Sequence, residues 1–202
     1  DPWWKNIHGG SVPVRLGTTI TTSLYNQTSR NIDMWKNPKV WSLAIAETIA
    51  WAGIFYLFPA MLMRWEAHFG WSRVELTLGF TSALIISAIT AIFAGRLIDR
   101  GHGRVLMTLS AFAGGLLIAM LPLLEHLWQF YLIWVLIGFT MAGCLYEPCF
   151  AFLTHVYYPK SKRPIIMVTL VAGFAGTLCF PLSNVIANNL HWQAAGWVFS
   201  IL

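Results

Sequence analysis

The fold of this chain is decided around the stretch Gly95-Arg96-Leu97-Ile98-Asp99-Arg100-Gly101-His102-Gly103-Arg104. This short charged segment lies between two long apolar runs, Glu75 to Gly95 and Val105 to Leu124. Each run has roughly the 20 residues that a helix needs to cross a bilayer. A turn between antiparallel helices needs the backbone freedom of glycine, and Asp99 near a helix start can accept backbone N–H groups. The stretch therefore predicts a polar hairpin between two membrane-spanning helices.

The rest of the chain repeats this pattern of apolar runs and short polar segments. Hydrophobic residues make up 57% of the chain and charged residues 10%, whereas soluble domains carry about a quarter charged residues. The last apolar segment stops at Leu202 and is too short to cross a bilayer. We therefore expect an all-α membrane protein in a lipid bilayer. The predicted spans are 40–63, 75–95, 105–124, about 127–154 and about 164–187, with an incomplete sixth at 192–202.

Lysine and arginine are distributed unevenly between alternate polar segments, and this asymmetry predicts the orientation. One side has only Arg64 and Arg73. The other side has Lys5, Arg15, Arg30, Lys36, Lys39, Arg96, Arg100, Arg104, Lys160, Lys162 and Arg163. Because cytoplasmic segments carry the excess of basic residues, we expect a multi-pass protein of the cell membrane, the bacterial inner membrane, with a cytoplasmic N-terminus. The formal charge of +5 then reflects topology, and we expect no nucleic-acid partner.

The polar residues 1–39 precede the first predicted span. They lack the compact apolar core of a cleavable signal peptide and contain no methionine before Met34. We expect either a cytoplasmic tail over 1–39 or translated upstream sequence over 1–33, with the natural start at Met34.

The stretch quoted above resembles the signature loop of the major facilitator superfamily. That loop reads glycine, any residue, leucine, any residue, aspartate, arginine or lysine, any residue, glycine and then basic residues. The positions that fit are Gly95, Leu97, Asp99, Arg100 and Arg104. His102 stands where the family usually has glycine, with Gly101 and Gly103 on either side. The resemblance implies that this loop latches a cytoplasmic gate, with Asp99 and Arg100 in that role.

Three further stretches look similar to one branch, the monocarboxylate and oxalate–formate transporters. They are Gly70-Trp71-Ser72-Arg73, Leu145-Tyr146-Glu147-Pro148 and the segment Tyr158 to Arg163. Superfamily members have twelve spans in two six-helix halves. The resemblance therefore implies that residues 40–202 form the N-terminal half-bundle with a truncated sixth helix. It also implies that the C-terminal six-helix half is missing, so that the chain is a fragment.

Two carboxylates, Glu47 and Glu147, lie inside predicted spans, where charged residues are costly and usually functional. Each lies about two turns, or about 10 Å, from the cytoplasmic end of its span. The resemblance implies that both helices border a central cavity. We hypothesise that Glu147 carries a proton during transport and that Glu47 is its partner or a cation ligand. In the alternative, Glu147 satisfies backbone groups freed by Pro148, and Glu47 extends toward the interface.

Further residues are candidates for the path. Pro148 removes a backbone donor and is expected to bend or break the fourth span. Trp51, Tyr56 and Tyr146 are candidates for lining the cavity, or they pack against neighbouring helices. No Lys or Arg lies within a predicted span, so an anionic solute would need a positive partner from elsewhere. The three cysteines are interpreted as small packing residues.

These observations predict a secondary active transporter of a small solute, a small organic acid with a coupling proton, working as a symporter by alternating access. The alternative is a non-transporting membrane sensor or assembly subunit. The sequence has no GxSxG, no HExxH and no paired intramembrane aspartates, so we do not expect an enzyme. No cofactor and no metal site are expected.

Overall fold

The computed structural model describes residues 37–202, and its helices lie between Pro38 and Ile201. Residues 1–36 of the predicted tail and the predicted start at Met34 lie outside the described residues. The regular structure of the described part is helical throughout. Its elements are α2 (Pro38–Ala50), η2 (Trp51–Tyr56), α3 (Leu57–Phe69), α4 (Arg73–Leu97), η3 (Ile98–His102), α5 (Gly103–Met120), η4 (Leu121–Leu123), α6 (Leu127–Cys144), α7 (Tyr146–Tyr157), α8 (Lys162–Ala172), α9 (Ala175–Asn189) and α10 (Trp192–Ile201).

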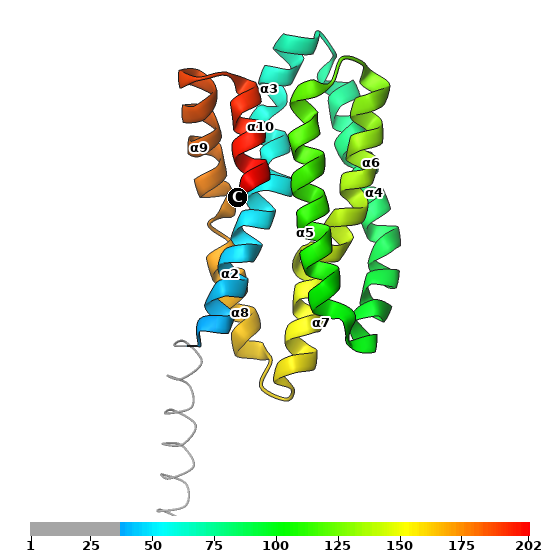
Figure 1. Ribbon diagram of the computed structural model, residues 1–202, viewed down its shortest axis with the longest axis vertical. Helices are drawn as coiled ribbons and strands as arrows, with labels where there is room; N and C mark the ends of the chain where they lie inside the picture. The colour runs from blue at the N-terminus through cyan, green and yellow to red at the C-terminus, as the bar shows by residue number, and fades with distance from the viewer. Residues whose placement is uncertain (1–36) are drawn as a thin grey trace, which may run out of the picture. The chain divides into compact units, whose positions relative to one another are not determined.

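Four continuous helical ranges of the described chain are long and apolar enough to cross a membrane. They are Pro38–Phe69, Arg73–Leu123, Leu127–Tyr157 and Lys162–Asn189. The second range reverses direction at Gly101, whose φ is 84°, so α4 and α5 run in opposite directions (Figure 1). A φ in this region suits glycine because a side chain there clashes with the backbone. Gly101 therefore supplies the turn, whereas the neighbouring His102 has an ordinary φ of −91°.

The first helical range contains an irregular turn at its middle. α2 and α3 are joined by η2, a π-helical segment in which the chain is wound more widely than in an α-helix. The Cys179 thiol of α9 donates a hydrogen bond of 3.2 Å to the Ala52 carbonyl oxygen of this segment. The thiol therefore pairs with a buried backbone acceptor in the irregular turn.

Two other ranges are interrupted. α6 ends at Cys144, and Leu145 has an extended backbone with φ −88° and ψ −160° before α7 begins at Tyr146. α8 and α9 are separated at Gly173 and Phe174. Interrupted helices leave backbone groups without helical partners, so within a membrane they are tolerated only inside protein or beside water.

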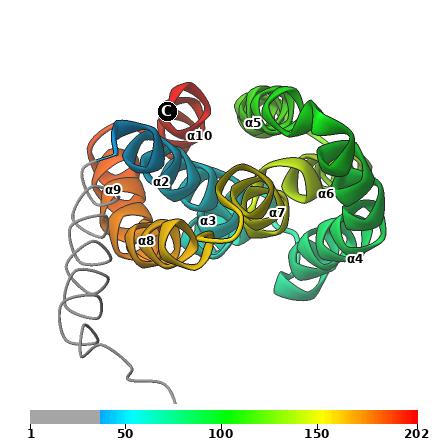
Figure 2. The ribbon, with the colours of Figure 1, turned by 90° about the horizontal axis from the view of Figure 1, so that it is seen from below.

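Seen along the helices, α8 and α9 lie on one side of α2 and α3, and α4, α5 and α6 lie on the other (Figure 2). The axes of α4 and α6 approach closely because α6 has a glycine at the contact. A Cβ atom on Gly138 would lie 2.5 Å from the Ala83 carbonyl oxygen of α4. Beside this contact, Trp134 of α6 packs edge-on against Phe58 and Phe80 in the larger buried cluster. Close packing through small residues is typical of helices in membranes.

Candidate functional site

The structure brings the five predicted path residues together where the irregular turn η2 meets the start of α7. The Trp51 and Tyr146 rings have centroids 4.5 Å apart, and Trp51 also contacts Tyr56 at 6.2 Å. Tyr146 in turn stacks on Phe150. The aromatic rings of η2 and α7 therefore form one continuous set of contacts.

Glu47 lies one turn before Trp51 and is the most deeply placed charged group of this cluster. Its exposed fraction is 2%, and its Oε2 atom has no hydrogen-bond partner. The Cys149 thiol and the Trp51 indole are its polar neighbours, yet Trp51 Nε1 also lacks a partner in good geometry. Among the described residues, no lysine or arginine pairs with this carboxyl group. A buried charge without a partner is costly, so this arrangement favours a proton or a bound ligand at Glu47.

Glu147 occupies the first turn of α7, two residues after the extended Leu145, and is exposed. It interacts electrostatically with Glu47, so the two carboxyl groups lie at one site. Pro148 follows it in the same first turn, where backbone N–H groups have no partner within the helix. The break precedes Pro148 and lies at Leu145.

The predicted gate loop has its charged side chains at the surface. Asp99, Arg100 and Arg104 are exposed, and Gly103 is buried. A Cβ atom on Gly103 would lie 3.0 Å from Phe152 of α7. The Arg104 guanidinium carbon lies 5.9 Å from the centroid of the same ring, within the range of a cation–π contact. The loop is therefore packed against α7, the helix that carries Glu147.

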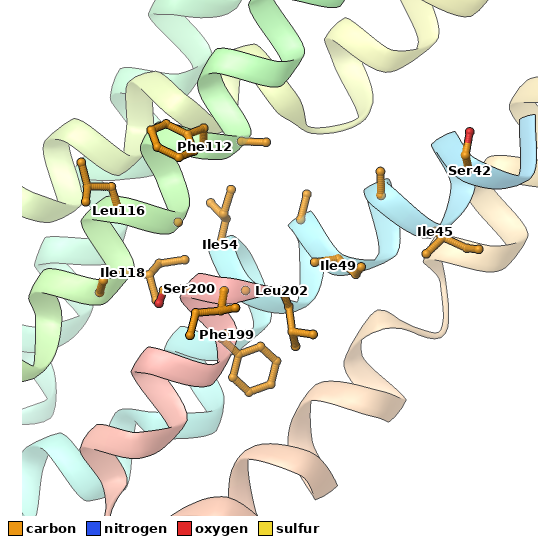
Figure 3. A pocket seen from close by; sticks show the side chains of 17 residues that line it. Ser42, Ile45, Ile49, Ile54, Phe112, Leu116, Ile118, Phe199, Ser200 and Leu202 are labelled. Carbon is orange, nitrogen blue, oxygen red and sulfur yellow. The ribbon is translucent and has the colours of Figure 1, made fainter. Parts of the chain in front are cut away.

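A separate groove of about 580 Å³ lies between α2, α5 and α10 (Figure 3). Its lining is apolar apart from Ser42 and Ser200, and it contains none of the five predicted path residues. Ile45 and Ile49 line it from the face of α2 that does not carry Glu47. The polar cluster and the apolar groove are thus two different features of the first helix.

Similarity to known proteins decides the family of this chain. The family model described as Major Facilitator Superfamily matches residues 43–202, which is most of the chain. The chain belongs to the major facilitator superfamily. It is therefore a multi-pass membrane protein of a transporter family, and the resemblance carried by the signature loop is confirmed.

Among curated proteins, the superfamily member is similar to two kinds of relative. One is the "Voltage-gated purine nucleotide uniporter SLC17A9" of Mus musculus, 28% identical in an alignment of 164 residues that covers 73% of this chain and 37% of the relative. Another is the "Multidrug resistance protein MdtG" of Dickeya zeae, 27% identical in an alignment of 143 residues that covers 63% of this chain and 33% of the relative. The chain thus spans about a third of the length of these relatives. No solved structure matches it.

Three features of this superfamily member escaped the sequence reasoning. The irregular turn η2 has no signal in hydropathy, because its residues are as apolar as those around it. Cys149 was interpreted as a packing residue, although its thiol faces Glu47. The first helix continues to Phe69 and not only to Met63, so Arg64 lies within it. The described residues have no cluster of three or more metal-binding side chains.

Proposed function

We propose that this chain is part of a secondary active transporter that moves a small solute by alternating access. The observation that carries the proposal is the Glu47–Trp51–Tyr146–Glu147 cluster at the meeting point of two helix irregularities. Membrane transporters place their binding sites at such discontinuous helices, since free backbone groups and polar side chains can there face a solute.

The exposed position of Glu147 indicates where the path runs. An exposed carboxylate on a membrane helix is too costly to face lipid, so it faces water or another part of the protein. We propose that this face meets a C-terminal six-helix half, with the solute path between the halves. On this account, residues 40–202 form an N-terminal half-bundle of six spans.

We propose that Glu147 carries the coupling proton of a symporter and that Glu47 is its partner. Two interacting carboxyl groups, of which Glu47 is buried, avoid the cost of two like charges when one of them is protonated. Transfer of that proton between water and the site can then be linked to solute binding. Among the described residues, Glu47 has no basic side chain that would hold it as a permanent ion pair.

The remaining assignments follow from the charged loops and the relatives. Asp99 and Arg100, exposed beside α7, are proposed to latch the cytoplasmic gate. The excess of Lys and Arg on one side supports a cytoplasmic N-terminus, and the proposed location is the bacterial inner membrane. The mouse relative is named as a nucleotide uniporter, which favours an anionic solute such as a small organic acid. The proposed activity needs no cofactor and no enzymatic step.

The test uses the complete transporter, purified and reconstituted in proteoliposomes, with uptake of radiolabelled organic acids measured against external pH. Wild-type uptake is expected to rise as the external pH falls. The Glu147→Gln variant should bind solute but lose this pH dependence, because glutamine cannot carry the proton. An unchanged pH dependence in the variant removes the proton role, and no uptake by the wild type for any small solute removes the transport proposal.

A further inference from the structure

Arg64 is held by two asparagines of another helix. Its Nη2 atom donates hydrogen bonds of 2.7 Å to Asn184 Oδ1 and 2.7 Å to Asn188 Oδ1. Asn188 Nδ2 also donates to Asn184 Oδ1 at 3.3 Å. The two asparagines are one turn apart on α9, so both amide oxygens face the guanidinium of α3.

Hydrogen bonds hold the Arg64 guanidinium in place, but no carboxylate of the described chain neutralises its positive charge. The nearby Glu66 is engaged elsewhere, since its Oε2 accepts a hydrogen bond of 2.7 Å from Arg73 Nε in an ion pair. Within the described chain, Arg64 has no carboxylate partner. The asparagine oxygens use Nη2 alone, so the N–H groups of Nε and Nη1 are left for a ligand. A guanidinium presents such groups in a planar fork that matches a carboxylate or phosphate.

Arg64 and its two asparagines lie where a dissolved ligand can reach them. Arg64 lies near the end of α3, and Asn184 and Asn188 near the end of α9, at the upper end of the bundle in Figure 1. The signature loop, η3, is at the lower end. Arg64 is half-buried and both asparagines are exposed, an arrangement that is too polar for a surface facing lipid tails. Arg64 therefore lies where an anion can approach from the side opposite the loop.

We propose that Arg64, oriented by Asn184 and Asn188, binds the carboxylate or phosphate group of an anion at this end of the bundle. The identification of that anion as the transported solute rests on the proposed function. The site would supply a positive partner for an anion, which no Lys or Arg within the predicted spans supplies. It would attract an anionic solute to the path before the solute reaches the Glu47 and Glu147 region.

A purely structural role is the competing explanation, because the same hydrogen bonds tie α3 to α9. The Asn188→Asp variant separates the two roles. An aspartate at position 188 keeps the contact between α3 and α9 and turns the hydrogen bond into an ion pair. A purely structural role therefore predicts normal or higher thermal stability and no change in anion binding. If Arg64 binds an anion, the carboxylate introduced by Asn188→Asp should pair with the guanidinium and exclude that anion.

The test measures anion binding by the full-length protein in neutral detergent, as the rise in melting temperature caused by acetate, inorganic phosphate and adenosine triphosphate. At least one of these anions is expected to stabilise the wild type. Arg64→Gln and Asn188→Asp should each weaken its apparent affinity at least about tenfold, since a charge-assisted contact is lost. Arg64→Lys should retain part of it. Glu66→Gln, which breaks only the neighbouring ion pair, is the control and should bind as the wild type does.

A second arm distinguishes a free anion from a lipid headgroup. Protection that requires vesicles containing phosphatidylglycerol, is absent with phosphatidylcholine and disappears in Arg64→Gln identifies the headgroup as the anion. Equal stabilisation of wild type, Arg64→Gln and Asn188→Asp by every probe overturns the site. Intact anion binding without uptake by the complete transporter would instead contradict the proposed function alone.

Discussion

The rings of Trp51 and Tyr146 lie with their centroids 4.5 Å apart, and this contact joins two irregular points of the bundle. Trp51 begins the π-helical segment of the first helix, and Tyr146 begins α7 after the extended Leu145. Glu47 precedes Trp51 by one turn, and Glu147 directly follows Tyr146. Both carboxylates therefore lie in regular α-helix within about one turn of an irregular backbone segment, η2 for Glu47 and Leu145 for Glu147.

Replacement of Glu47 by glutamine is expected to preserve folding, because the amide has nearly the same shape and removes a buried acid that has no partner at Oε2. Thermal stability should be unchanged or higher. The pH dependence of uptake by the complete transporter should change, since Glu147 would lose the carboxyl group with which it interacts. Glu125→Gln, at an exposed position outside the helices, is the control. A pH profile identical to the wild type would separate Glu47 from proton coupling.

The Trp51→Phe variant tests the indole N–H apart from the ring. Phenylalanine keeps an aromatic ring against Tyr146, but removes the Nε1 donor that has no partner in good geometry. We expect little change in melting temperature and a weaker apparent affinity for solute, by roughly the factor of ten that one hydrogen bond contributes. Unaltered uptake kinetics would assign Trp51 to packing alone.

Gly138 is predicted to be indispensable for the contact between α4 and α6. An alanine Cβ would meet the Ala83 carbonyl oxygen at 2.5 Å, and backbone cannot move aside without separating the helices. We expect Gly138→Ala to destabilise the protein by about 1 to 3 kcal/mol, measured as a lower melting temperature in detergent. Gly95→Ala is the matched control, because no atom lies within 4 Å of its added Cβ. Equal melting temperatures for the two variants would contradict the close approach.

The turn of the signature loop depends on Gly101 and not on His102. With φ at 84°, alanine at position 101 would adopt a left-handed conformation at a cost of about 1 to 2 kcal/mol. His102→Ala, at φ −91°, should cost little. Thermal unfolding of both variants checks this, and the account is contradicted if His102→Ala is the more damaging substitution. The result would also explain why histidine is accepted where the family usually has glycine.

The sequence predicted the helical class and the apolar segments well, because a bilayer imposes length and composition directly on the chain. The sequence was less informative where contacts with a distant segment decide the local structure. The first span was predicted to end at Met63, and the helix continues beyond it to Phe69, where hydropathy registers the charge of Arg64 and not the asparagines of α9 that receive it. Helix ends that depend on side chains from distant segments cannot be read from local composition.

The irregular backbone segments were also only partly predictable from the sequence. Pro148 predicted an interruption of the fourth span, and the structure has it at Leu145, on the N-terminal side of the proline. The π-helical turn at Trp51–Tyr56 has no such marker in the sequence. It is accompanied by the Cys179 thiol, which donates to the Ala52 carbonyl from a segment far along the chain. Only the packed structure brings that donor to the turn.

The central claim is that Glu147 faces an aqueous path, and labelling of engineered cysteines tests it most directly. The native cysteines of the complete transporter, which include Cys144, Cys149 and Cys179, are first replaced, and Glu147→Cys or Leu109→Cys is then introduced. Both positions are exposed, but Leu109 lies on the apolar outer face of α5. A membrane-impermeant, charged thiol reagent is predicted to modify Cys at position 147 and to leave position 109 unmodified. Modification of position 109 with protection of position 147 would contradict the account.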